Sequence, residues 1–131
     1  MWSTGRLPFD GRAFLEVSRL LALHVGKEHC ERSASSRAYY ACYWRGRSYC
    51  IKRNILISPP PSYGKGSHQF LQDQFAERSI WKIFSELSRL SDRRQEADYA
   101  PEYPGLLATE VNAVIRDAEV LIQLLDELDA G

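Results

Sequence analysis

The sequence contains few cysteines, no long apolar run and no excess of charge of either sign. Cys30, Cys42 and Cys50 form no CxxC pair, which argues against a disulfide framework and against a zinc ribbon. We interpret all three as reduced residues that pack between helices. No apolar run approaches the roughly 18 residues that a membrane-spanning helix needs, and the N-terminus shows no apolar stretch of a secretion signal. We therefore expect a cytoplasmic protein that does not contact a membrane.

Motifs that would indicate a known chemistry are also scarce. The sequence has no GxSxG, HExxH or EF-hand pattern. Residues 64–67 read GKGS, but the first glycine of a phosphate-binding loop and a strand before it are missing. His24 and His29 have no further ligands at metal-binding spacing, and His24 and His68 are more typical of helix boundaries. We expect neither a bound metal nor another cofactor.

The bulk composition is that of one globular domain. Of the 131 residues, 44% are hydrophobic and 26% are charged, and the formal net charge is zero. These values are close to ordinary soluble usage, and the length is sufficient to bury a core without disulfides or metals. We interpret residues 1–131 as a single domain.

Hydrophobic periodicity predicts helices throughout, and no segment shows the alternation of a strand. Small residues at helical spacing, Ala34, Ala38 and Ala41, indicate close packing of a long helix against its neighbours. The predicted class is all-α, an antiparallel up-and-down bundle of four to five helices. The expected N-caps are Asp10, Ser67 and Thr109, and Gly26 is an expected stop. The expected helices cover residues 10–26, 27–57 and 67–76, a fourth that begins near 77–79 and stops between 97 and 101, and a last one that follows residue 109 and has an apolar face to residue 128.

Charge is unevenly distributed along the chain. Residues 27–53 carry seven basic and two acidic side chains, and residues 110–131 carry one basic and six acidic side chains. Two neighbouring helices could complement each other in this way. Alternatively, the basic helix could bind RNA or another polyanion along a stripe that contains Arg37, Arg45 and Lys52.

The segment 91–104, SDRRQEADYAPEYP, concentrates charge where a helix is expected to stop before Pro101. Arg94 and Asp98 are four residues apart and can pair across one helical turn. Acidic side chains at a helix C-terminus are slightly unfavourable unless a nearby arginine or a partner compensates them. This arrangement indicates a candidate functional site.

Two motifs resemble the HEPN-domain family, in particular its small UPF0332-like branch. Residues 32–43, RSASSRAYYACY, look like the family's SRAYYA segment, and residues 94–99 read RQEADY. The resemblance covers about residues 31–127. It implies an all-helical, often dimeric protein that is frequently paired with a small nucleotidyltransferase in bacterial toxin–antitoxin or defence modules.

The resemblance also implies a site. Many members are metal-independent ribonucleases in which an arginine and a following histidine meet a second copy's pair across a dimer cleft. Here Arg93 matches the arginine, and Asp98 stands where the histidine would be. The candidate catalytic residues are Arg93, Arg94 and Asp98, and the candidate binding residues are Arg37, Tyr40, Tyr99, Arg45 and Lys52.

Two functions follow from these residues. The first is a nucleotide-, RNA- or partner-binding subunit with an atypical motif that lacks its histidine. Its partners would be a second copy of the chain, a nucleotidyltransferase or RNA. The second is a metal-independent endoribonuclease toxin that uses Arg93 or Arg94, with Asp98 or His68 as the proton-transfer group.

Overall fold

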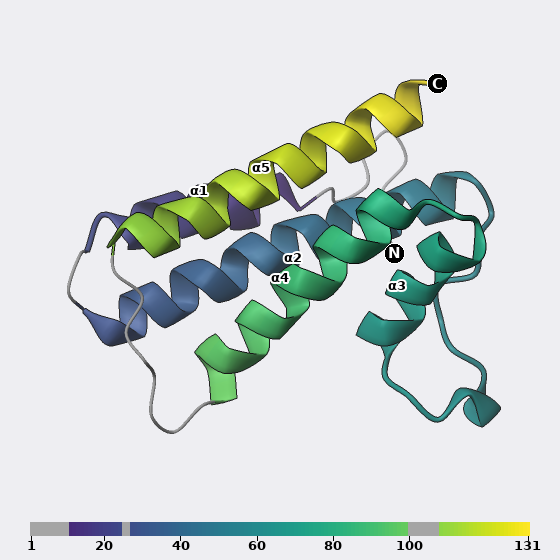
Figure 1. Ribbon diagram of the computed structural model, residues 1–131, viewed down its shortest axis with the longest axis horizontal. Helices are drawn as coiled ribbons and strands as arrows, with labels where there is room; N and C mark the ends of the chain where they lie inside the picture. Colours follow the sequence, from purple (N-terminus) through teal and green to yellow (C-terminus); the bar gives the residue numbers. More distant parts are fainter. Residues whose placement is uncertain (1–10, 25–26, 100–107) are drawn as a thin grey trace, which may run out of the picture.

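The computed structural model describes residues 11–24, 27–99 and 108–131, and within these residues it contains helices and no strand (Figure 1). This confirms the all-α prediction. None of the helices in the described ranges combines the length and the apolar character that crossing a membrane requires. The elements are α1 (Arg12–Ala22), α2 (Glu28–Lys52), a short 3-10 helix (Pro61–Tyr63), α3 (Ser67–Glu77), α4 (Trp81–Tyr99) and α5 (Ala108–Ala130).

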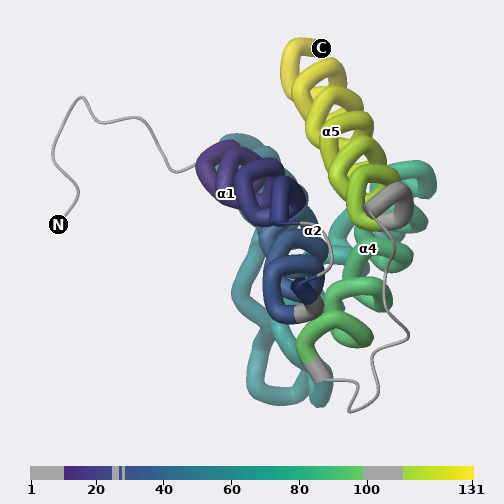
Figure 2. Tube along the Cα trace, turned by 90° about the vertical axis from the view of Figure 1, so that its left-hand side faces the viewer, coloured from purple at the N-terminus to yellow at the C-terminus, as the bar shows by residue number. Residues whose placement is uncertain are grey.

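The long helix α2 lies at the centre and packs against α1, α4 and α5 (Figures 1 and 2). In Figure 1, α1 runs back along α2, α4 runs antiparallel to α2, and α5 returns antiparallel to α4. The short α3 sits at one end and packs mainly against α4. The arrangement is the up-and-down helical bundle that the sequence predicts.

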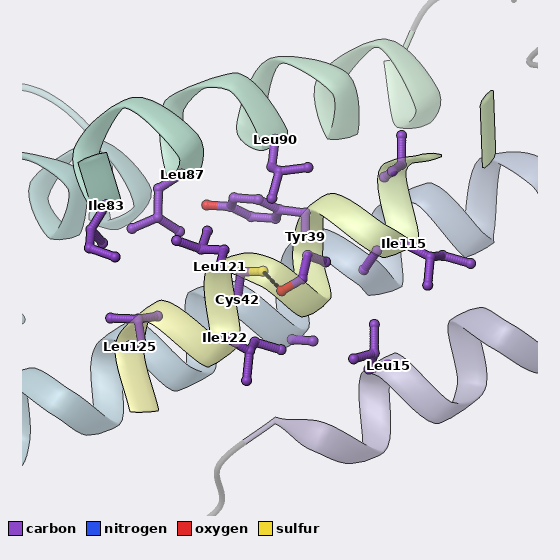
Figure 3. Close-up of a cluster of buried hydrophobic side chains, with 14 of the residues drawn as sticks. Leu15, Tyr39, Cys42, Ile83, Leu87, Leu90, Ile115, Leu121, Ile122 and Leu125 are labelled. Carbon is purple, nitrogen blue, oxygen red and sulfur yellow. Dashed lines mark hydrogen bonds between the residues drawn. The ribbon is translucent and has the colours of Figure 1, made fainter. Parts of the chain in front are cut away.

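Small residues allow the close approach of other helices to α2. Ala34, Ala38, Ala41 and Cys42 are fully buried, as the spacing of small side chains predicts. Larger side chains from the surrounding helices fill the space around them, and Figure 3 shows Leu15, Leu87, Leu90, Leu121 and Leu125 in this core. Fully burying a leucine contributes roughly 1.5–3 kcal/mol, so this cluster is the main source of stability.

All three cysteines are free and buried, which confirms their interpretation as packing residues. The Cys42 thiol donates a hydrogen bond to the Ala118 carbonyl oxygen at 3.4 Å, drawn as the dashed line in Figure 3. Burial raises the pKa of Cys42, and it raises the pKa of Cys50 to about 11. Both thiols are therefore protonated and unreactive near neutral pH.

The end of α2 and the start of α4 differ from the prediction for the same reason. Helix α2 stops at Lys52 rather than near Ile57, because Asn54 adopts the left-handed conformation with φ 58°. The Asn54 amide donates to the Ile51 carbonyl, and the next amide donates to the Cys50 carbonyl, which closes a Schellman motif. Ser79, also at φ 58°, ends α3 in the same way, so α4 begins only at Trp81.

The predicted N-caps are also corrected. Helix α3 begins at Ser67 with Gly66 at its N-cap, and α5 begins at Ala108, one residue before Thr109. Asp10 and Gly26 lie outside the described residues, and Gly11 occupies the N-cap of α1.

Gly11 permits a close contact between the start of α1 and α2. It has φ 88°, and a Cβ atom there would lie 2.8 Å from the Trp44 Cβ and 2.9 Å from the Ala41 carbonyl oxygen. Both the backbone conformation and the space therefore require glycine.

Candidate polar site between α2, α3 and α4

The charge asymmetry of the sequence corresponds to ion pairs between α2 and α5. Arg45 is buried, and its guanidinium contacts Asp126 at 2.7 Å and Asp129 at 2.8 Å. Lys52 contacts Asp129 at 3.1 Å, and Arg53 also binds Asp129. Of the two alternatives for Arg45 and Lys52, these contacts show the first, in which two neighbouring helices carry complementary charges.

Asp129 is the centre of these ion pairs. Burial opposes its ionisation, but hydrogen bonds from Arg53, Arg45 and Lys52 outweigh that effect and hold the pKa of Asp129 well below its usual range. Asp126 and Asp129 pair with Arg45, and Asp129 also pairs with Lys52, so part of the positive charge of these two cations is offset within the bundle.

Three contacts compensate the acidic C-terminal end of α4. The Arg94 Nη1 lies 3.7 Å from the Asp98 Oδ2, which confirms the pairing expected from their spacing. The Ser36 hydroxyl of α2 donates to the same Asp98 oxygen at 3.4 Å. Arg32, also from α2, donates to the Ala97 carbonyl oxygen at 3.0 Å. A cation therefore lies at the C-terminal end of α4, where it interacts favourably with the negative end of the helix dipole.

Arg94 points into the molecule between α4 and α2. Its side chain is only 8% exposed, and its guanidinium carbon lies 5.4 Å from the Tyr39 ring centre and 5.8 Å from the Tyr40 ring centre. These distances are those of cation–π contacts. The neighbouring Arg93 is half-buried and points about 100° away around the helix. Arg94 therefore lies in the polar cluster, although Arg93 is the arginine that best matches the family motif.

His68, from the first turn of α3, faces the same tyrosines. Its Nδ1 lies 2.6 Å from the Tyr39 hydroxyl oxygen. Its ring centre is 4.5 Å from that of Tyr43, 5.5 Å from that of Tyr39 and 5.9 Å from that of Tyr40. His68 was expected only as one alternative for the proton-transfer group, and the structure brings it to the tyrosines that Arg94 contacts.

The surroundings keep His68 neutral and Tyr39 protonated. Burial, followed by the nearby charge of Arg94, lowers the pKa of His68. Burial raises the pKa of Tyr39, although Ser91 and Arg94 oppose the effect. When Nδ1 carries the imidazole proton, it donates to Tyr39 and leaves the Nε2 lone pair able to accept a proton. In the other tautomer, Tyr39 donates to Nδ1.

The loop before α3 is anchored to the helix that it precedes. Helix α2 has already ended at Lys52, and the chain returns through Pro59, Pro60 and the short 3-10 helix that begins at Pro61. The Tyr63 hydroxyl donates to Asp73, and burial together with this carboxylate raises the pKa of Tyr63 to about 12. These contacts fix the start of α3, and with it His68.

We refer to the residues gathered here as the Arg94 cluster. It contains Arg32, Ser36, Tyr39, Tyr40, Tyr43, His68, Arg94 and Asp98. Of the candidate site residues, it brings together Tyr40, Arg94 and Asp98. Helix α4 ends at Tyr99, whose side chain lies outside the described part of the chain.

A basic and aromatic face of α2 continues from the cluster. Arg37 is exposed and lies 5.6 Å from the Phe14 ring centre, and Arg47 lies 4.9 Å from the Trp44 ring centre. Arg37, Tyr40, Trp44 and Arg47 recur at intervals of three or four residues, so they share one side of the helix. Arg47 was not a predicted site residue, although this periodicity could have indicated it.

The other residues that the prediction missed had no local signal. Arg32 and Ser36 join the cluster because α4 lies antiparallel beside α2.

In the described parts of the chain, no group of histidine, cysteine or acidic residues is arranged to hold a metal ion. In comparisons with known proteins, neither a family model nor a curated sequence matches this chain. The resemblance to the HEPN-domain family thus rests on the two sequence motifs.

Proposed function

We propose that this protein is an HEPN-like helical subunit that binds single-stranded RNA along α2 and the Arg94 cluster. It would act in a bacterial toxin–antitoxin or defence-type module. The observation that carries the proposal is the contact of Arg94 and His68 with the same two tyrosines, Tyr39 and Tyr40. The two motifs that resemble the family supply two walls of this cluster, α2 and α4.

Charge and ring chemistry support RNA as the ligand. Arg32 and Arg94 exceed Asp98 by one positive charge when His68 is neutral. Arg37 and Arg47 extend the positive face of α2, and each lies against an aromatic ring. Single-stranded nucleic acids bind surfaces of this kind, where cations follow the phosphates and rings contact bases. Because Arg94 is buried, it contributes positive electrostatic potential, while the more exposed arginines make the phosphate contacts.

The protein partners remain those that the resemblance implies. They are a second copy of the chain and a small nucleotidyltransferase.

The binding proposal is tested with a fluorescent single-stranded RNA in anisotropy titrations at several salt concentrations. Arg37→Ala and Arg47→Ala should each weaken binding and lower the slope of log K against log salt concentration by about one. Lys82→Ala is the matched control, because Lys82 is an exposed cation on α4 that pairs with Glu86. Absence of binding at low salt, or an equal loss in the control, would refute the proposal.

The position of His68, in contact with the Tyr39 that Arg94 also contacts, together with its lowered pKa, favours a metal-independent ribonuclease as the second candidate. A neutral imidazole can accept the proton of a ribose 2′-hydroxyl, whereas a carboxylate is ordinarily a weak base at neutral pH. The 2′-oxygen then bonds to phosphorus, and the 5′-oxygen leaves and takes a proton from solvent. The product is a 2′,3′-cyclic phosphate. Arg94 stabilises the charge that develops on the phosphate.

This second candidate has a separate test. The purified protein is incubated with tRNA and total RNA in the presence of a metal chelator. Cleavage that is lost in His68→Gln and in Arg94→Lys but kept in Asp98→Asn would establish His68 as the proton carrier. Cleavage lost in Asp98→Asn and kept in His68→Gln would reverse the assignment. RNA that stays intact at high protein concentration would rule out the ribonuclease and leave RNA binding as the remaining candidate.

A further inference from the structure

Asp98 is the acidic member of the Arg94 cluster. Its Oδ2 atom accepts a hydrogen bond from the Ser36 hydroxyl at 3.4 Å and lies 3.7 Å from the Arg94 Nη1. The Asp98 side chain is 27% exposed. Within the described residues, its second oxygen, Oδ1, has no hydrogen-bond partner. The protein therefore holds one oxygen of this carboxylate and leaves the other able to accept a hydrogen bond from a ligand.

A carboxylate is an unusual group in a site for a polyanion. It repels the phosphates of a bound strand, and it accepts hydrogen bonds but donates none. It favours binding only when the ligand brings a donor to it. The RNA backbone carries such a donor on every nucleotide, the 2′-hydroxyl, which DNA lacks. The amino groups of the bases are donors too, but RNA and DNA share them. A carboxylate here thus suits ribose better than deoxyribose.

The neighbours of Asp98 on α2 follow the order of the groups in a nucleotide. Arg32, Ser36 and Tyr40 recur at intervals of four residues, so successive members of this row are about 6 Å apart along the helix. Asp98 contacts the middle member, Ser36. A cation lies one turn before it and an aromatic ring one turn after it. Within a nucleotide, the ribose likewise lies between the phosphate and the base. A strand with its phosphate near Arg32 and its base near Tyr40 therefore places a ribose beside Asp98.

We propose that Asp98 selects RNA over DNA by accepting a hydrogen bond from a ribose 2′-hydroxyl of the bound strand. This specificity rests on the RNA-binding function proposed above. Ser36 and Arg94 are positioning residues, because they hold Oδ2 and leave Oδ1 for the ribose. The contact contributes to binding whether or not the strand is then cleaved. The aspartate at the position where the resemblance places a histidine thus has a role in recognition.

Anisotropy titrations with three labelled strands of one sequence test this specificity. The strands contain ribose, deoxyribose or 2′-fluororibose, and the sequence uses only adenine and cytosine, so that the bases are the same in all three. The 2′-fluoro strand keeps a sugar conformation close to that of RNA but has no donor at the 2′ position. The wild-type protein should bind the ribose strand at least about tenfold more tightly than either other strand, as expected for a hydrogen bond to a charged group.

Asp98→Ala should reduce both preferences to less than about threefold. Removal of a negative charge should leave the affinity for the deoxyribose strand unchanged or higher, so binding of that strand also shows that the variant is folded. Glu96→Ala is the matched control. Glu96 is an exposed acidic residue of α4 and lies about 200° around the helix from Asp98, so this variant should keep the wild-type preference.

Three results would overturn the assignment of Asp98 while RNA binding itself stands. They are equal wild-type affinities for the three strands, a preference that persists in Asp98→Ala, and a preference that Glu96→Ala loses to the same extent. If none of the three strands binds at low salt, the proposed RNA-binding function fails, and the specificity fails with it.

Discussion

The hydroxyl oxygen of Tyr39 and the Nδ1 of His68 lie 2.6 Å apart, and this hydrogen bond ties α3 to the middle of α2. The two residues are 29 positions apart in the sequence. Through Tyr39, the imidazole also comes close to Arg94, whose charge contributes to lowering the pKa of His68. One hydrogen bond thus joins α2, which bears the first motif, to α3, which bears neither motif.

The lowered pKa of His68 makes stability depend on pH. The pKa of His68 is below 6.5 in the folded protein and near 6.5 in the unfolded chain, so the unfolded chain binds the proton first as the pH falls. The free energy of unfolding should therefore decrease as the pH falls through and below about 6.5. Urea denaturation at a series of pH values should show that His68→Gln lacks this part of the decrease, while a slope that persists unchanged would disprove it.

The buried position of Arg94 predicts a large effect on stability. Arg94→Ala removes two cation–π contacts and leaves Asp98 without one of its partners, which should cost about 1–3 kcal/mol. The adjacent Arg93 is the matched control, and Arg93→Ala should change the free energy of unfolding by no more than about 0.5 kcal/mol. Chemical denaturation of the two variants separates the roles of the two arginines. Equal losses would show that Arg94 has no special position.

Asp129 should stabilise the protein above mildly acidic pH. Its pKa is lowered in the folded state, so its contribution is complete above the unfolded value near pH 4 and decreases as the pH falls below it. Asp129→Asn should lower the free energy of unfolding by about 2–4 kcal/mol at neutral pH, because Arg45 is left buried with fewer partners.

Asp117→Asn is the matched control for Asp129, since Asp117 pairs with the more exposed Arg89. It should cost less than about 1 kcal/mol. Thermal or urea denaturation at neutral and at acidic pH checks both values. The difference between the two variants should shrink in acid, and a difference that is independent of pH would contradict this account of Asp129.

The left-handed residue that ends α3 offers a stabilising substitution. Ser79 has φ 58°, a conformation that costs roughly 1 kcal/mol for a residue with a Cβ atom and little for glycine. Ser79→Gly should therefore raise the free energy of unfolding by about 0.5–1 kcal/mol. Ser85→Gly, at an exposed position inside α4, should lower it by a similar amount. Two variants that change in the same direction would rule out the conformational explanation.

Local patterns in the sequence predicted the bundle well. The spacing of Ile83, Leu87 and Leu90 identified α4, and these side chains are buried in the core. The helix ends were less accurate, because Asn54 and Ser79 adopt a left-handed conformation that their residue types permit but do not require.

The candidate site was predicted only in part. The pairing of Arg94 with Asp98 follows from a spacing of four residues, and it is present. The contacts of Arg32 with Ala97 and of Tyr39 with His68 depend on which helices become neighbours. Residue spacing within one helix contains no information about such contacts.

The left-handed corners at Asn54 and Ser79 enclose a segment that we expect to open as a unit. Between them, α3 packs mainly against α4 and touches α2 less, and its tie to α2 includes the bond from His68 to Tyr39. Elements with fewer buried contacts open more often than the whole molecule unfolds. Amide hydrogens of α3 should thus exchange with deuterium faster than those of α2, and Tyr39→Phe should widen the difference. The Arg94 cluster would then be uncovered for brief intervals without the loss of the bundle.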